Sequence, residues 1–227
     1  MAKIFIDAGH GGKDSGAVNG NIYEKDIALS IALKLEKMLK TCGIETVMSR
    51  TTDVFVTLQD RASIANNCNA ILFVSIHVNS STGFAREIET LVYSYRGNNK
   101  DIAQSIQDSL IEATGTLDRG VKERPDLYVL SATKMTAILV ETGFIKTEYK
   151  NLLSDNYQDK IAKAITNAIC KSFNLEVKNI DKIENVEQAL TVLVNAKIIN
   201  SPDYWLKACD VVKYLPDLLI NFANKIQ

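Results

Sequence analysis

The chain contains only two histidines, and each one ends an apolar run that is typical of a buried strand. One run leads from Lys3 to His10 and the other from Ala70 to His77. Ligands of open α/β sheets bind at the carboxyl ends of the strands, and imidazole is the commonest side chain that binds a catalytic metal at neutral pH. The sequence therefore indicates a shared metal site for His10 and His77. The alternative is that each histidine packs at a strand end and is hydrogen-bonded to backbone.

A third ligand is expected to be a carboxylate. Glu24 begins a predicted helix soon after the turn that carries His10, and it would complete a His, His, Glu zinc site with a fourth position for water. Asn21 and Glu24 also fit a capping box, which is the structural alternative. Asp7 and Asp14 are rival carboxylate ligands.

Glu141 is the candidate catalytic carboxylate, because it ends the apolar run 137–140 and precedes Thr142 and Gly143. A strand end at this position would present its side chain at the same edge of the sheet as the histidines. Zinc lowers the pKa of its water from about 15.7 toward about 7, and a glutamate can take the remaining proton and pass it to a leaving nitrogen. The alternative is a solvated glutamate at a strand end.

Other chemistries are disfavoured by the motifs. The glycine-rich turn 9–16 has Asp14 directly after Lys13, where a phosphate-binding loop needs a hydroxyl residue. No Gly-x-Ser-x-Gly sequence is present, and the four cysteines form no Cys-x-x-Cys pair, so neither a serine elbow nor a thiolate zinc site is indicated. Metal-assisted hydrolysis is the reaction class that remains.

Strand-like and helix-like stretches alternate through most of the chain, which is typical of an α/β sandwich. The predicted strands are 3–7, 45–49, 70–76, 89–95, 127–130 and 136–140, and the predicted helices are about 24–41, 58–66, 101–113 and 156–173. We expect residues 1–175 to form this catalytic domain. Residues 176–184 are polar, without a clear period, and are predicted to be a linker.

Residues 185–227 are predicted to be a small helical module of three short helices. Asn185 with Gln188 fits a capping box, and Ser201-Pro202 and Pro216 mark two further helix starts. A module of about 45 residues is close to the lower limit for independent folding, so docking or a homodimer through these helices would stabilise it. Tyr204, Trp205 and Tyr214 would either stack on sugar rings or form the core.

The composition argues against two classes of partner. The 26 basic and 27 acidic residues nearly cancel, so specific nucleic-acid binding is not expected. The longest apolar runs are too short to cross a bilayer, and the N-terminus lacks the features of a secretory signal. We expect the protein to be made in the cytoplasm, so that an external substrate would be reached only after release.

Six motifs, in family order, resemble the zinc-dependent N-acetylmuramoyl-L-alanine amidases with a type 3 amidase domain. The resemblance covers about residues 2–175. The motifs are Gly9-His10-Gly11-Gly12-x-Asp14-x-Gly16-Ala17, Glu24, Ser49-Arg50-Thr51-x-Asp53, Leu58-x-x-Arg61-x-x-x-Ala65-Asn66, Ser75-Ile76-His77-x-Asn79 and Leu139-Val140-Glu141-x-Gly143-Phe144.

The resemblance implies a mixed, mostly parallel sheet flanked by helices, with His10, Glu24 and His77 as zinc ligands and Glu141 as the catalytic residue. It also implies peptidoglycan as the substrate, cleaved between N-acetylmuramic acid and the L-alanine of the stem peptide. Two positions depart from the family pattern. Thr136 stands where proline is common, and Ala-Arg-Glu-Ile-Glu at 85–89 replaces the usual Gly-x-Glu stretch.

The tail from about residue 180 resembles the C-terminal segments of amidase endolysins from phages of Gram-positive hosts. This implies release through a holin, or by lysis of a mother cell, before the enzyme acts on the cell wall. We expect the tail to target the wall, or to pack or dimerise. The alternative functions are a non-catalytic wall-binding protein and a zinc peptidase or deacetylase that acts on another wall component.

Overall fold

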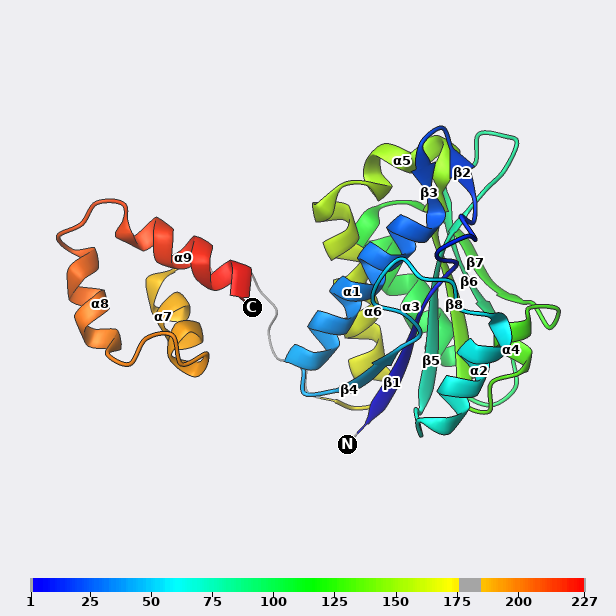
Figure 1. Cartoon of the computed structure of the whole chain (residues 1–227), viewed down its shortest axis with the longest axis horizontal. Coiled ribbons are helices and arrows are strands. Elements are labelled where there is room, and N and C mark those ends of the chain that lie inside the picture. Colours follow the sequence, from blue (N-terminus) through cyan, green and yellow to red (C-terminus); the bar gives the residue numbers. More distant parts are fainter. Residues whose placement is uncertain (1, 176–184, 227) are drawn as a thin grey trace. The chain divides into compact units, whose positions relative to one another are not determined.

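The computed structural model describes residues 2–175 and 185–226, which belong to two compact units, Met1–Lys178 and Asn179–Gln227 (Figure 1). The linker predicted at 176–184 lies outside the described residues. Each unit is considered by itself below.

The first unit is built on a six-stranded sheet with the strand order β4-β1-β5-β8-β6-β7. The first four strands in this order are parallel, β6 runs antiparallel to β8, and β7 runs parallel to β6. The predicted mixed, mostly parallel sheet is therefore confirmed. The strands are β1 (Lys3–Ala8), β4 (Glu45–Met48), β5 (Leu72–Asn79), β6 (Glu87–Val92), β7 (Leu117–Glu123) and β8 (Thr136–Phe144), and a separate hairpin pairs β2 (Val18–Asn19) with β3 (Ile22–Tyr23).

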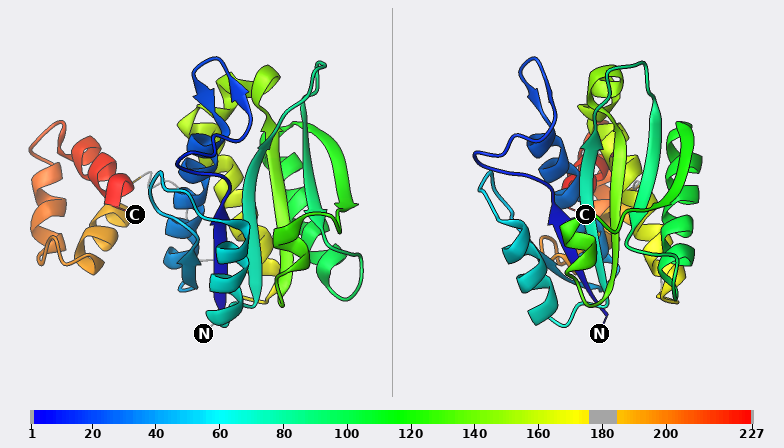
Figure 2. Two further views of the ribbon diagram at one scale, coloured as in Figure 1. Left: turned by 45° about the vertical axis from the view of Figure 1, so that its right-hand side comes forward. Right: turned by 90° about the vertical axis from the view of Figure 1, so that its right-hand side faces the viewer.

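Helices cover both faces of this sheet (Figure 2). Side chains of α1, α3 and α6 share the larger core with alternate strand residues such as Ile4 and Ile6. The opposite face carries Phe5 and Phe73, whose rings stack 5.4 Å apart and pack with residues of α2 and α4. This division follows from the two-residue repeat of a strand. The helices are α1 (Glu24–Thr41), α2 (Leu58–Asn67), α3 (Asn99–Thr114), α4 (Tyr128–Ser131), α5 (Ile145–Leu152) and α6 (Asp155–Ser172).

One prediction along the first unit is wrong, and one strand of the main sheet was not predicted. The stretch 127–130, expected to be a strand, lies mostly in the short helix α4. The strand that was not predicted is β7, which pairs with β6 and has the largely polar sequence Leu-Asp-Arg-Gly-Val-Lys-Glu. Because β7 is an edge strand, none of its residues is fully buried, and it lacks the apolar alternation that identifies a strand in a sequence.

The second unit contains three helices, α7 (Val186–Asn195), α8 (Pro202–Cys209) and α9 (Leu215–Ile226). The Asn185 side chain accepts a 2.9 Å hydrogen bond from the Gln188 amide, as expected for a helix cap. The small core consists of Ala189, Leu190, Leu193, Leu219 and Ala223, with Trp205 packed against it. Leu206, Leu218 and Phe222 lie outside this core and are exposed. Among the described residues, no helix is long and apolar enough to cross a membrane.

Candidate metal centre

The structure brings His10, Glu24 and His77 together at the carboxyl edge of the sheet, with one ligand atom from each lying within 4.8 Å of the others. His10 follows the end of β1 by two residues, Glu24 is the first residue of α1, and His77 lies near the end of β5. Because β1 and β5 are parallel neighbours, their ends meet at one edge. This is the position that the two apolar runs indicate.

Glu24 joins the two imidazoles. Its Oε1 atom lies 2.8 Å from Nδ1 of His77 and 3.2 Å from Nε2 of His10. The same oxygen accepts a hydrogen bond from the Val78 amide, and Oε2 accepts one from the Ala17 amide. The residue at the helix N-cap is Tyr23, so the capping-box alternative with Asn21 is wrong.

The two rival carboxylates have other partners. Asp7 is buried and forms a 2.6 Å ion pair with Arg61 and a 2.7 Å hydrogen bond with the Ser75 hydroxyl. Asp14 lies 2.9 Å from Nδ1 of His10, on the side of the ring away from Glu24. A carboxylate in this position fixes the imidazole orientation and leaves Nε2 directed toward the other two groups.

Two buried arginines hold the turn that carries His10, which adopts a left-handed conformation with φ of 58°. Arg50 donates to the carbonyls of Ala8 and Gly9 and also to that of Lys25, the residue after Glu24. Arg61 donates to the carbonyls of Ala8 and His10. The backbone of this turn is therefore fixed by interactions with residues about 40 to 50 positions away in the chain.

A glycine in the turn lets the ligands approach each other. A Cβ atom at Gly16 would lie 2.6 Å from both Oε2 of Glu24 and Cδ2 of His10, and the residue has φ of 64°. Both the space and the backbone conformation therefore favour glycine here.

The electrostatics of the three groups favour positive charge at the point they share. Burial alone would lower the pKa of His10, but Glu24 and Asp14 outweigh it and raise that pKa to about 9. The pKa of His77 is also raised, because Glu24 outweighs its burial. Burial would raise the pKa of Glu24, yet its hydrogen bonds to the two imidazoles hold it well below the ordinary value. Two nitrogens and an ionised carboxylate that converge in this way fit a zinc ion.

Glu141 lies beside this group on the neighbouring strand. It is the register partner of His77 across the β5–β8 pair, so both side chains point to the same face of the sheet. Its Oε2 atom is buried and has no hydrogen-bond partner among the described residues. Burial raises the pKa of Glu141 to about 7. A carboxyl group of this kind exchanges protons readily near neutral pH.

Glu89 on β6 is the register partner of Glu141 and extends the row of polar side chains. It is buried, and its oxygens bind the Asn79 amide, Arg119 and Lys122. Sequence reasoning did not assign a role to Glu89 or to the two turn-binding arginines. The signal was available, because Arg50 and Arg61 lie in two of the family motifs and Glu89 ends the 85–89 stretch.

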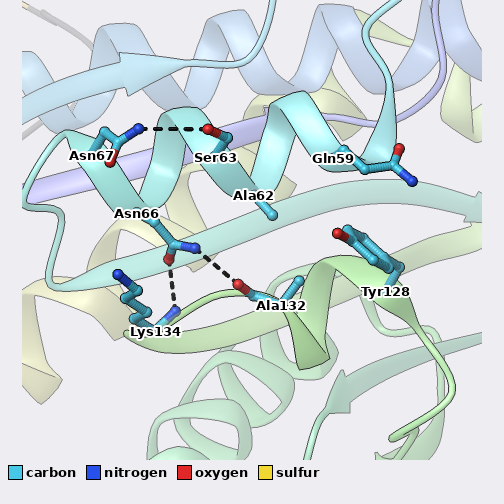
Figure 3. Close-up of a pocket in the computed structure, with 8 residues that line it drawn as sticks. All are labelled: Gln59, Ala62, Ser63, Asn66, Asn67, Tyr128, Ala132 and Lys134. Carbon is cyan, nitrogen blue, oxygen red and sulfur yellow. Dashed lines mark hydrogen bonds between the residues drawn. The ribbon is translucent and has the colours of Figure 1, made fainter.

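A second polar site lies on the same side of the sheet, in a depression of about 300 Å³ between α2 and α4 (Figure 3). Its Asn66 side chain donates to the Ala132 carbonyl and accepts from the Lys134 amide. These bonds attach α2 to the segment that leads into β8. We regard this depression as structural.

Comparison with known proteins gives consistent results. Residues 4–171 match the family model described as N-acetylmuramoyl-L-alanine amidase. A sporulation-specific N-acetylmuramoyl-L-alanine amidase of Bacillus subtilis is 37% identical over 209 residues, which cover 88% of this chain and 80% of that protein. An endolysin of Bacillus phage SPP1 is 37% identical over 184 residues, covering 78% and 68% respectively. The crystal structure of an amidase from Clostridium difficile 630 superposes with a TM-score of 0.73 at 38% identity, covering 76% of this chain and 97% of that one.

Proposed function

Because the chain belongs to the N-acetylmuramoyl-L-alanine amidase family, we propose how its residues carry out this activity. The protein is a peptidoglycan hydrolase that cleaves the amide bond between N-acetylmuramic acid and the L-alanine of the stem peptide. In our proposal His10, Glu24 and His77 bind one zinc ion, and Glu141 is the general base. The proposal rests on one observation, the convergence of these three groups beside a buried and unpartnered carboxyl oxygen.

His10 would contribute Nε2, His77 would contribute Nδ1, and Glu24 would contribute its carboxylate. Asp14 supports this assignment, because its contact with Nδ1 of His10 leaves Nε2 as the ring nitrogen that faces Glu24 and His77. The raised pKa values of both imidazoles reflect the electron-rich carboxylate between them, and a zinc ion would take the place of those protons. When bound, zinc acts as a Lewis acid on the scissile carbonyl and on the attacking water.

Glu141 would move the proton. It takes a proton from the water as the new carbon–oxygen bond forms, and it gives that proton to the amide nitrogen as the carbon–nitrogen bond breaks. A pKa near 7 suits both steps, because the group is then neither too weak a base nor too weak an acid at neutral pH. Its burial also keeps bulk water from competing for the proton.

Mass spectrometry of fragments released from purified walls tests the reaction. The amidase produces free L-alanine amino termini and intact muramic acid, whereas a deacetylase or a stem-peptide endopeptidase would leave the lactyl–alanine amide uncut. In Glu141→Ala we expect no release of stem peptides, while zinc stays near one equivalent per chain. Full activity in that variant would remove Glu141 from the mechanism.

His77→Ala is the complementary variant. Loss of one ligand opens the site, so zinc content and turnover should fall together. Unchanged zinc stoichiometry would show that the proposed ligand set is wrong.

We further propose that the protein acts as an endolysin, reaching the wall of a Gram-positive host after holin-dependent or lytic release. Support comes from its similarity to the SPP1 endolysin. Similarity to a sporulation-specific amidase supports the second route, release from a lysing mother cell. Added to walls from outside, the full chain should lyse them; in intact producing cells, lysis should need a holin. Lysis of those cells without a holin would contradict this route.

We assign the second unit to wall binding. Tyr204 and Tyr214 are 68% and 70% exposed, so their rings are accessible to sugars, whereas Trp205 contributes to the small core. The full chain with Tyr204→Ala and Tyr214→Ala should sediment less with purified walls while it keeps its activity on soluble muropeptides. Unchanged sedimentation, together with a dimeric mass in solution, would instead support self-association.

A further inference from the structure

We propose that the substrate crosses the carboxyl edge of the sheet in one direction, with the muramoyl sugar on the β1–β4 side and the stem peptide over β6 and β7. On the peptide side, Arg119 and Lys122 would bind a carboxylate of the stem peptide. This inference rests on the proposed roles of the three ligands and of Glu141. It adds an orientation and two specificity-determining regions, which those roles do not include.

The strand order arranges the reacting groups in a row. His10 follows β1, and His77 lies near the end of β5. Glu141 lies on the next strand, β8, and Glu89 lies on β6 beyond it. The register pairs His77 with Glu141 and Glu141 with Glu89, so these three side chains share one face. A substrate that contacts both the ligand group and Glu141 therefore lies along this row.

The chemistry gives the row a direction. The carbonyl of the scissile amide must lie at the ligand group, where it is polarised, and its nitrogen must reach Glu141 to receive a proton. The carbonyl belongs to the lactyl group of muramic acid, and the nitrogen belongs to L-alanine. The sugar therefore extends back past β1 toward β4, and the peptide continues past β8 toward β6 and β7.

The sugar side presents an apolar strip made of Val54, Phe55 and Leu58, which are 48%, 43% and 52% exposed. Val54 and Phe55 lie directly against the turn that carries His10, because a Cβ atom at Gly12 would come within 2.6 Å of the Phe55 amide nitrogen and 3.2 Å of the Val54 carbonyl carbon. Adjacent exposed apolar residues at the rim of a polar site are typical of a ligand-binding surface. The Lys13 ammonium lies 4.5 Å from the centre of the Phe55 ring and covers one of its faces. The other face is the one that would stack on the C–H face of a pyranose ring.

The peptide side presents a cation pair made of Arg119 and Lys122, which are about two-fifths exposed. Lys122 binds Glu89 at 2.5 Å, and Arg119 lies 3.3 Å from Glu89 and 3.2 Å from Glu87. A lysine has three N–H donors and an arginine has five, so these contacts leave donors directed to solvent. The Arg119 guanidinium also lies 5.5 Å from the centre of the Phe144 ring, which holds it beside β8.

The test measures KM for two variants on soluble muropeptide substrates that differ in two features. The first change shortens the glycan from several disaccharides to one. The second replaces the carboxylate of the residue after L-alanine by a carboxamide. Phe55→Ala should remove most of the advantage of the longer glycan, an effect of about threefold in KM. Lys122→Met should remove most of the preference for the carboxylate, an effect of about tenfold in KM.

Each variant should leave the other preference unchanged, because the two regions lie on opposite sides of the scissile bond. Tyr93→Ala and Lys100→Met are matched controls at the opposite edge of the sheet, and both preferences should survive in them. A crossed result, in which Phe55→Ala alters the peptide preference and Lys122→Met the glycan preference, would reverse the orientation. Equal effects of either variant on all four substrates would show a structural role only and would overturn the proposal.

Two measurements keep the outcome interpretable. Zinc content and far-ultraviolet circular dichroism identify a variant that has lost its fold or its metal, and Phe55→Leu and Lys122→Gln then replace the first pair in the same assay. Failure of the proposed function has a different signature. In that case the wild-type chain itself would bind no zinc or would cleave another bond.

Discussion

Replacing Arg61 tests whether one buried ion pair maintains the turn beneath the metal centre. The Arg61 guanidinium and the Asp7 carboxylate are 3% and 1% exposed, and they lie 2.6 Å apart. Burial alone would raise the pKa of Asp7, but the Arg61 charge and the Ser75 hydroxyl hold it below its ordinary value. Arg61→Met keeps much of the aliphatic volume and removes the charge, so Asp7 remains buried without compensation.

The expected cost follows from the burial of both partners. Removal of one member of a fully buried ion pair destabilises a protein by about 3 to 5 kcal/mol. The free energy of unfolding falls by about 2 kcal/mol per molar urea, so the urea concentration at the midpoint of unfolding should fall by about 1.5 to 2.5 M. Adding Asp7→Asn to Arg61→Met should recover at least about 1 kcal/mol, because it removes the uncompensated charge.

The stability lost in Arg61→Met should depend on pH in a defined direction. In the wild-type protein the lowered pKa of Asp7 contributes stability above about pH 4, and this stability is lost as the pH falls through the folded-state pKa. In Arg61→Met burial is no longer opposed by that charge, so Asp7 takes up a proton more easily. The difference between the two proteins should therefore shrink as the pH is lowered from 7 toward 4.

The assay uses the full chain and two optical signals. The single tryptophan, Trp205, lies in the second unit, so its fluorescence reports that unit. Far-ultraviolet circular dichroism is dominated by the larger first unit, and only this transition should shift. Arg96→Met is the matched control, because Arg96 is exposed and a surface change of this kind costs within about 0.5 kcal/mol. A loss below about 1 kcal/mol in Arg61→Met would refute the reasoning.

Three further predictions concern zinc affinity, measured by competition with a chelator on the full chain. Arg50→Lys should weaken zinc binding by about tenfold or more, because lysine cannot bond the carbonyls of Gly9 and Lys25 together, and wild-type affinity would contradict this coupling. Gly16→Ala should lose zinc, since its Cβ would displace the Glu24 carboxylate, and retention of one equivalent would show that the turn adapts. Affinity should rise with pH up to about 9, because His10 holds a proton below its raised pKa, and a flat profile from pH 6 to 9 would contradict that shift.

The fold could be predicted to the extent that elements bury an apolar repeat. Helix α1 was expected at 24–41 and is found there, because Ile27, Ile31 and Leu35 recur at helical spacing and are buried. Strand β7 was missed, and the short hairpin of β2 and β3 offers too few residues for any period. The stretch 127–130 has an apolar content that suits a strand or a buried helix, so its sequence alone did not distinguish them.

The candidate site could likewise be predicted only where a local sequence pattern marks the position of a residue. His10 and His77 could be placed at one edge, since strand ends are visible as the ends of apolar runs. The partners of Asp7 could not be foreseen, because Arg61 and Ser75 lie 54 and 68 residues away and approach only when α2 and β5 pack beside β1. The position of Glu89 beside Glu141 likewise depends on an antiparallel register that no local pattern encodes.

Anomalous diffraction from crystals of the zinc-loaded protein, recorded on both sides of the zinc absorption edge, tests the central claim most directly. We predict one peak per chain within bonding distance of Nε2 of His10, the Glu24 carboxylate and Nδ1 of His77. A fully loaded crystal whose peak lies elsewhere, or in which these three groups bond only to one another, would contradict the account.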